Sequence, residues 1–102
     1  MKTLIYNYIK NHPQTTYAEL SRDVDGFSGD RQTMYQSGIV LWLNMSKEAE
    51  DAIQELVAEN LIFASVSTLP YLIDGPVLNL PIAKVNRRYK NPHWLPLVFS
   101  VK

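Results

Sequence analysis

Basic and aromatic side chains alternate near the C-terminal end of the sequence, within residues 84–94. Cations interleaved with ring faces can bind a phosphate backbone and stack a base. A structural interpretation competes with this one, because the rings could pack on a sheet while the cations pair with carboxylates or face solvent. The segment ends in Trp94, whose type is common among interface anchors. The candidate nucleic-acid-binding residues are Lys84, Arg87, Arg88, Tyr89, Lys90 and His93.

A second group of ionisable residues, in the segment 46–61, is mostly acidic. Its polar positions combine one cation and one glutamine with five carboxylates: Lys47, Glu48, Glu50, Asp51, Gln54, Glu55 and Glu59. On an exposed helix such carboxylates form a solvated face rather than an acid/base pair, because no pocket perturbs them. The same face could contact a protein partner. The candidate residues for that alternative are Glu48, Asp51, Glu55 and Glu59.

Residues for catalysis or metal binding do not occur in recognisable patterns. The sequence has no cysteine, and His12 and His93 lack the spacing of a metal-binding pair. No GxSxG, GxGxxG or GKS/GKT pattern is present, and residues 26–29 lack the length and the lysine of a phosphate-binding loop. We therefore expect a protein that is not an enzyme and that uses no metal and no cofactor.

The length and composition fit one domain. With 102 residues, 46% of them hydrophobic, the chain can bury a core without disulfides or metals, so a single domain over residues 1–102 is expected. The net charge is zero, but residues 1–60 hold five basic and nine acidic side chains, whereas residues 61–102 hold five basic and one acidic. Such asymmetry can mark a basic binding face, or it can reflect charges that meet after folding.

No targeting or membrane-spanning segment is expected. Asn7, Lys10 and Asn11 interrupt the apolar stretch that a signal peptide would need. The longest apolar run, residues 39–43, is far shorter than the roughly 20 residues that span a bilayer. The lack of cysteine fits a reducing compartment. These features predict a soluble, cytoplasmic protein without a membrane partner.

Helical periodicity and capping signals predict two helices in the N-terminal quarter of the chain. Apolar residues recur at helical spacing over residues 1–11, and Pro13 ends the pattern. Thr16 and Glu19 have the spacing of a capping box, in which each side chain accepts a hydrogen bond from the other residue's amide. A short second helix is therefore expected from Thr16 to about Val24.

The strongest helical signal lies at residues 46–61. Ser46 is a good N-cap residue, and the carboxylates that follow it suit the positive end of the helix dipole. The apolar positions form one continuous stripe, made by Ala49, Ala52, Ile53, Leu56, Val57 and Leu61.

The remaining segments predict strands and one long loop. Residues 25–38 hold three of the four glycines and show no periodicity, which predicts a loop. Residues 39–43 suit a buried strand with Trp42 in the core, although periodicity does not separate this run from a helical turn.

In the C-terminal half, residues 63–73 and 77–85 flank Asp74-Gly75, a pair typical of tight hairpin turns. Residues 94–101 alternate as one further strand. Three prolines, Pro70, Pro81 and Pro96, place these strands near sheet edges or bulges. The expected fold class is α+β, with three helices, a small antiparallel sheet, a C-terminal hairpin and a terminal strand.

This order of elements resembles the winged-helix superfamily. Residues 52–62 are similar to the end of a winged-helix recognition helix, with Asn60 in the place often held by glycine and Leu61-Ile62 leading into the wing. Asparagine tolerates the left-handed conformation needed there. The resemblance covers residues 1–24 and 44–85, but about twenty residues stand where a helix-turn-helix has only a few.

A further likeness concerns residues 84–90 and 92–96, which look like the closing residues of small uncharacterised proteins of Gram-positive bacteria and their phages. The winged-helix resemblance implies a fold and, for many members, DNA binding through the third helix. Here that helix would bring net negative charge into a groove walled by phosphates, which opposes binding.

Two functional hypotheses follow. In the first, the chain is a non-catalytic, regulatory winged-helix module that contacts nucleic acid through the wing and residues 84–94. In the second, it is a protein–protein adaptor that uses the acidic third helix or an exposed sheet edge. An exposed edge strand would also allow two copies to form a homodimer by strand pairing.

Overall fold

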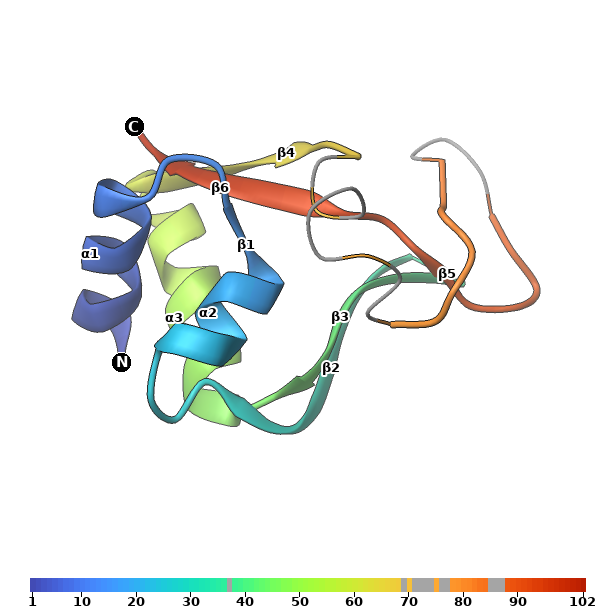
Figure 1. The fold of residues 1–102 in the computed structure, drawn as a ribbon, viewed down its shortest axis with the longest axis horizontal. Coiled ribbons are helices and arrows are strands. Elements are labelled where there is room, and N and C mark those ends of the chain that lie inside the picture. The colour runs from blue at the N-terminus through green and yellow to red at the C-terminus, as the bar shows by residue number, and fades with distance from the viewer. Residues whose placement is uncertain (37, 69, 71–74, 76–77, 85–87) are drawn as a thin grey trace.

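The fold is α+β, as the sequence predicts, and its helices gather at one end of the long axis (Figure 1). The computed structural model describes residues 1–36, 38–68, 70, 75, 78–84 and 88–102. In chain order, the elements of this part are α1 (Lys2–Asn11), β1 (Thr15–Thr16), α2 (Tyr17–Asp23), β2 (Ser28–Gln36), β3 (Ile39–Met45), α3 (Lys47–Ala58), β4 (Ile62–Val66), β5 (His93–Trp94) and β6 (Leu97–Val101).

The predicted helices are confirmed, and local capping explains where two of them begin. In α2, Glu19 N donates to Thr16 Oγ1 at 3.1 Å, and Thr16 N donates to Glu19 Oε1 at 3.1 Å, which completes the predicted capping box. In α3, Ala49 N donates to Ser46 Oγ at 3.1 Å. After α3, Asn60 has a φ of 64°, the left-handed conformation expected from its residue type.

The loop prediction for residues 25–38 is wrong for most of its length. Residues Ser28–Gln36 form β2, which pairs antiparallel with β3 through a register interrupted by several shifts. A strand that is polar and irregular shows no alternation of its own, so the pattern missed it. Its pairing with the apolar β3 stabilises it, and β3 itself confirms the predicted strand at residues 39–43.

The strands form two sheets, in the orders β1-β6-β4 and β2-β3-β5. In the first sheet β4 pairs antiparallel with β6 over its whole length, from Ile62↔Val101 to Val66↔Leu97. In the second, β5 pairs parallel with β3, with Ile39 opposite His93. The predicted small antiparallel sheet is therefore only part of the architecture.

The C-terminal strand predictions are corrected in part. The single strand expected over residues 94–101 is two strands in different sheets, separated by Pro96, which has no amide hydrogen for a sheet ladder. Of the hairpin expected around Asp74-Gly75, residues 69, 71–74, 76, 77 and 85 lie outside the described residues. The strand expected over residues 77–85 does not form in its described part, residues 78–84, which holds only an isolated parallel bridge between Ile82 and Trp94. The first strand of the expected hairpin overlaps β4, which is paired with β6.

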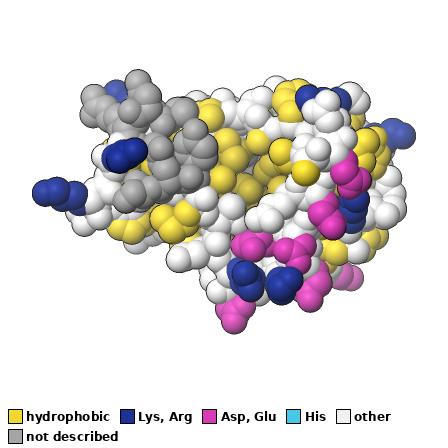
Figure 2. Space-filling model, turned by 180° about the vertical axis from the view of Figure 1, so that it is seen from behind, with side chains coloured by type: hydrophobic (Ala, Val, Ile, Leu, Met, Phe, Trp, Pro, Cys, Tyr) yellow, Lys and Arg dark blue, Asp and Glu magenta, His cyan; other side chains and the backbone are white. Residues whose placement is uncertain are grey.

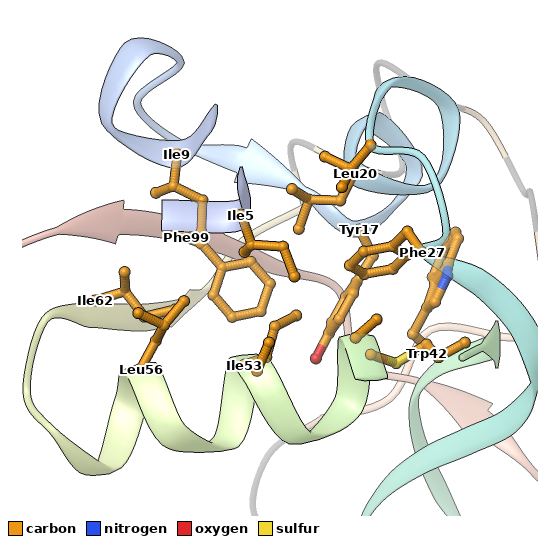
Figure 3. Close-up of a cluster of buried hydrophobic side chains, with 14 of the residues drawn as sticks. Ile5, Ile9, Tyr17, Leu20, Phe27, Trp42, Ile53, Leu56, Ile62 and Phe99 are labelled. Atoms are coloured by element: carbon orange, nitrogen blue, oxygen red, sulfur yellow. The ribbon is translucent and has the colours of Figure 1, made fainter. Parts of the chain in front are cut away.

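Tyr17 lies at the centre of the buried core, where side chains from both sheets meet (Figure 3). Its ring stacks on Trp42 with centroids 5.6 Å apart and makes an edge contact with Phe99 at 4.9 Å. Trp42 belongs to the second sheet and Phe99 to the first. Trp42 is 7% exposed, which confirms its predicted core position. Ile5 and Leu56 close the core from α1 and α3.

Replacing Tyr17 by alanine should therefore weaken both sheets together. We expect Tyr17→Ala to lower the free energy of unfolding by about 3–5 kcal/mol, the usual loss for a large buried ring. Urea denaturation followed by tryptophan fluorescence measures this. Leu4→Ala is the control, because Leu4 is 58% exposed and its loss should change stability by about 0.5 kcal/mol or less. Equal losses for the two variants would contradict the central position of Tyr17.

Candidate nucleic-acid interface

The residues on both sides of the predicted basic segment are fixed to β3 and to each other by backbone hydrogen bonds. His93 N donates to Gly38 O at 2.8 Å, and Leu95 N donates to Val40 O at 3.0 Å. Ala83 N donates to Trp94 O at 2.7 Å, which brings the two ends of the segment side by side. The described part of the segment, residues 84 and 88–94, here called the basic loop, is therefore attached to the second sheet, at the end of the molecule opposite the helices (Figure 1).

The aromatic residues of this loop are engaged within it. The Tyr89 ring stacks on His93 with centroids 3.7 Å apart and an interplanar angle of 19°, and Lys84 N donates to the Tyr89 hydroxyl at 2.8 Å. Trp94 is 2% exposed and belongs to the core. The rings of Tyr89 and His93 thus cover each other and shape the loop, which is closer to the structural interpretation of these residues than to base stacking.

The cations of the loop, by contrast, are available. Lys84, Arg88 and Lys90 are exposed, and none of the three forms an ion pair within the part of the chain that the structure describes. Arg87, the fourth predicted cation, lies outside that part. The structure thus settles one question left open by the sequence for these three residues: the acidic third helix does not neutralise them.

The carboxylates of α3 have partners of their own near the helical end. Asp51 accepts from Lys47 at 2.7 Å, and Glu59 accepts from Lys2 on α1, a contact that raises the pKa of Lys2. Glu50 lies 3.5 Å from Arg31 of β2, and its side chain is only 15% exposed. The expectation that Glu50 faces solvent is therefore wrong, because β2 covers it. Glu48 and Glu55 are exposed.

Sequence reasoning missed one polar cluster, which joins α1 to α2. The Tyr8 hydroxyl donates to Asp23 Oδ2 at 2.6 Å, and Arg22 donates to both oxygens of the same carboxylate, at 2.9 and 3.0 Å. The Tyr8 ring also stacks on His12, with centroids 4.1 Å apart. The i,i+4 spacing of Tyr8 and His12 was the available signal.

The contacts in this cluster shift the pKa values of Asp23 and Tyr8. The Arg22 guanidinium and then the Tyr8 hydroxyl hold the pKa of Asp23 well below its usual range. Burial and the hydrogen bond to Asp23 raise the pKa of Tyr8 to about 12. These shifts are accounted for by the contacts of Asp23 with Arg22 and Tyr8 and by the burial of Tyr8, and the Tyr8–Asp23 hydrogen bond links α1 to α2.

Comparisons of the chain with protein-family models, with curated protein sequences and with solved structures found no match. Among the described residues there is no group of three or more histidine, cysteine, aspartate or glutamate side chains that could hold a metal ion. No helix in the same part of the chain combines the length and apolar character needed to cross a membrane.

A substitution at Gly38 tests how the basic loop is attached to β3. Its φ is 79°, and a Cβ atom at this position would collide with the backbone of Tyr89. Gly75 is the matched control, because its φ is 73° but no atom of the described residues lies within 4 Å of a Cβ added there. We expect Gly38→Ala to destabilise the protein more than Gly75→Ala, since only the first adds a clash to the backbone strain. Amide hydrogen exchange at Ala83, His93 and Leu95 should accelerate only in Gly38→Ala. Equal effects of the two substitutions would contradict this attachment.

Tyr8 gives a pH prediction. Because its pKa is raised from 10.0 to about 12 in the folded chain, the link contributes stability below pH 10 that is lost as the pH rises to about 12. Tyrosine ring-carbon NMR shifts followed against pH should show one residue that titrates near 12. Asp23→Asn should lower that midpoint, because it removes the charged acceptor. A Tyr8 midpoint unchanged by this substitution would contradict the assignment.

Proposed function

We propose that this chain is a non-catalytic, winged-helix-like binding module that contacts the phosphate backbone of nucleic acid through the basic loop of residues 84–94. The observation that carries the proposal is that Lys84, Arg88 and Lys90 stay exposed and without ion pairs in the described part of the chain, on a loop fixed by its neighbours. Exposed cations without ion pairs meet the electrostatic requirement for phosphate binding.

The topology supports the winged-helix part of the proposal. A short strand, β1, lies between α1 and α2 and pairs with the last strand, which also pairs with the strand that follows α3. A three-helix core closed by a small antiparallel sheet is what the winged-helix resemblance implies. The chain departs from it by the hairpin β2-β3, which stands between α2 and α3 in place of a tight turn.

The charge of α3 argues that the chain contacts the nucleic-acid backbone rather than reading bases with this helix. The helix exposes Glu48 and Glu55, and its other carboxylates lie beside cations of α1, β2 and α3 itself. Phosphates would be repelled there and attracted to the basic loop at the far end of the molecule. Binding of this kind depends on charge and depends little on base sequence.

The proposal is tested by the salt dependence of binding. With a fluorescein-labelled short DNA duplex and the corresponding single strand, anisotropy titrations should show binding at low salt that weakens steeply as salt rises. Lys84→Ala, Arg88→Ala and Lys90→Ala should each reduce the slope of log K against log salt by about one unit if each cation touches a phosphate.

Lys10→Ala is the matched control, because Lys10 is an exposed cation on α1 at the helical end. It should leave the salt slope unchanged. Absence of binding to either probe at low salt would overturn the proposal, and so would a control variant that loses as much affinity as the loop variants.

A further inference from the structure

An apolar groove runs between α3, the sheet β1-β6-β4 and the hairpin β2-β3. It has a volume of about 330 Å³. Figure 2 shows hydrophobic side chains along a hollow on the rear face of the molecule. Its lining combines buried rings at the base with small aliphatic residues at the sides, chiefly Tyr17, Leu41, Val57, Ala58, Ala64 and Phe99.

Much of the groove wall is open to solvent rather than closed by the described chain. Val57 of α3 is 46% exposed, and Ala58 and Ala64 are also exposed. Val66 lies on the same side of β4 as Ala64, because alternate residues of a strand face one side, and it is 53% exposed. An apolar surface of this kind, contributed by a helix and a sheet, suits an interaction with another chain.

The α3 side of the groove is acidic. Residues three and four apart on a helix are neighbours, so Asp51 and Glu55 lie beside Gln54 and Ala58, which line the groove. Glu55 is exposed and forms no ion pair within the described residues, whereas Asp51 accepts a hydrogen bond from Lys47 at 2.7 Å. In Figure 2, Asp and Glu side chains gather beside the hydrophobic hollow, and Lys or Arg side chains lie among some of them.

We propose that this groove docks a basic amphipathic helix of a protein partner. The apolar side of such a helix presents residues at i, i+3, i+4 and i+7, which would enter the groove, while its lysines or arginines would meet the α3 carboxylates. The groove volume of about 330 Å³ suits a small number of aliphatic anchor side chains. Of the four acidic residues that the sequence indicated for partner contact, Asp51 and Glu55 neighbour residues that line the groove, whereas Glu48 and Glu59 do not.

Charge also argues against a second copy of this chain as the occupant. A two-fold dimer through this face would place the same patch of each copy against the other, so two acidic α3 helices would approach. Like charges across an interface oppose association. A partner of opposite charge removes that conflict.

The test uses a synthetic helical peptide with leucine at every third or fourth position and lysine elsewhere. A matched peptide carries glutamate in place of lysine. Isothermal titration calorimetry should detect binding of the lysine peptide and none of the glutamate peptide. Ala58→Phe, which fills the groove from an exposed position, should weaken binding by about tenfold or more. Leu4→Phe adds an equally large exposed ring on α1 and should leave the affinity unchanged.

A second set of variants tests the charge. Asp51→Asn and Glu55→Gln together should weaken binding and its salt dependence, whereas Asp25→Asn, an exposed carboxylate outside α3, should not. Failure of the lysine peptide to bind, or equal losses in Ala58→Phe and Leu4→Phe, would overturn the proposal. Sedimentation velocity of the free protein provides the remaining outcome. A dimer that Ala58→Phe dissociates would assign the groove to a second copy and overturn the proposed occupant.

Discussion

The contacts of the Tyr17 ring are the interaction on which the two sheets depend. Tyr17 opens α2, directly after the strand β1, and its ring lies between Trp42 of the second sheet and Phe99 of the first. Burial raises the pKa of its hydroxyl above the ordinary value, with a smaller effect of Glu50. The capping box at Thr16 sets where α2 begins and so where this ring enters the core. The two proposed binding surfaces lie on the two sheets that Tyr17 joins.

Those surfaces differ in how the fold treats charge. On the second sheet, the rings of the basic loop are covered by one another, and its described cations stay unpaired. On α3, several carboxylates are held beside cations from α1 and β2, while the groove next to them is apolar. In the part of the chain that the structure describes, the charge imbalance between the two halves is therefore retained as two separate regions, because no ion pair joins the cations of residues 84–94 to the α3 carboxylates. Because the two regions are separate, the two partners proposed for this small domain have opposite charges.

The elements predicted well from the sequence are those with local signals. Ser46 and the pair Thr16 and Glu19 cap their helices through side chains within three residues, so pattern and structure agree. The strand β2 escaped prediction because its stability comes from pairing with β3 rather than from its own alternation. The break at Pro96 was visible in the sequence, but the sequence did not indicate that the flanking strands belong to different sheets.

The candidate sites were predictable only in part. The cations of residues 84–94 could be named in advance, but whether the described ones pair with the α3 carboxylates depends on tertiary placement. The groove could not be foreseen at all, because its walls come from residues on distant elements.

The parallel pairing of β5 with β3 has a consequence for how the chain reaches its structure. Residues 39 and 40 lie opposite residues 93 and 94, so the contact closes a long stretch of chain that includes α3 and β4. Contacts of such separation carry a large loop-closure entropy and form slowly compared with helices and adjacent hairpins. The basic loop should thus acquire its shape late in folding, after the hairpin β2-β3 has supplied a template.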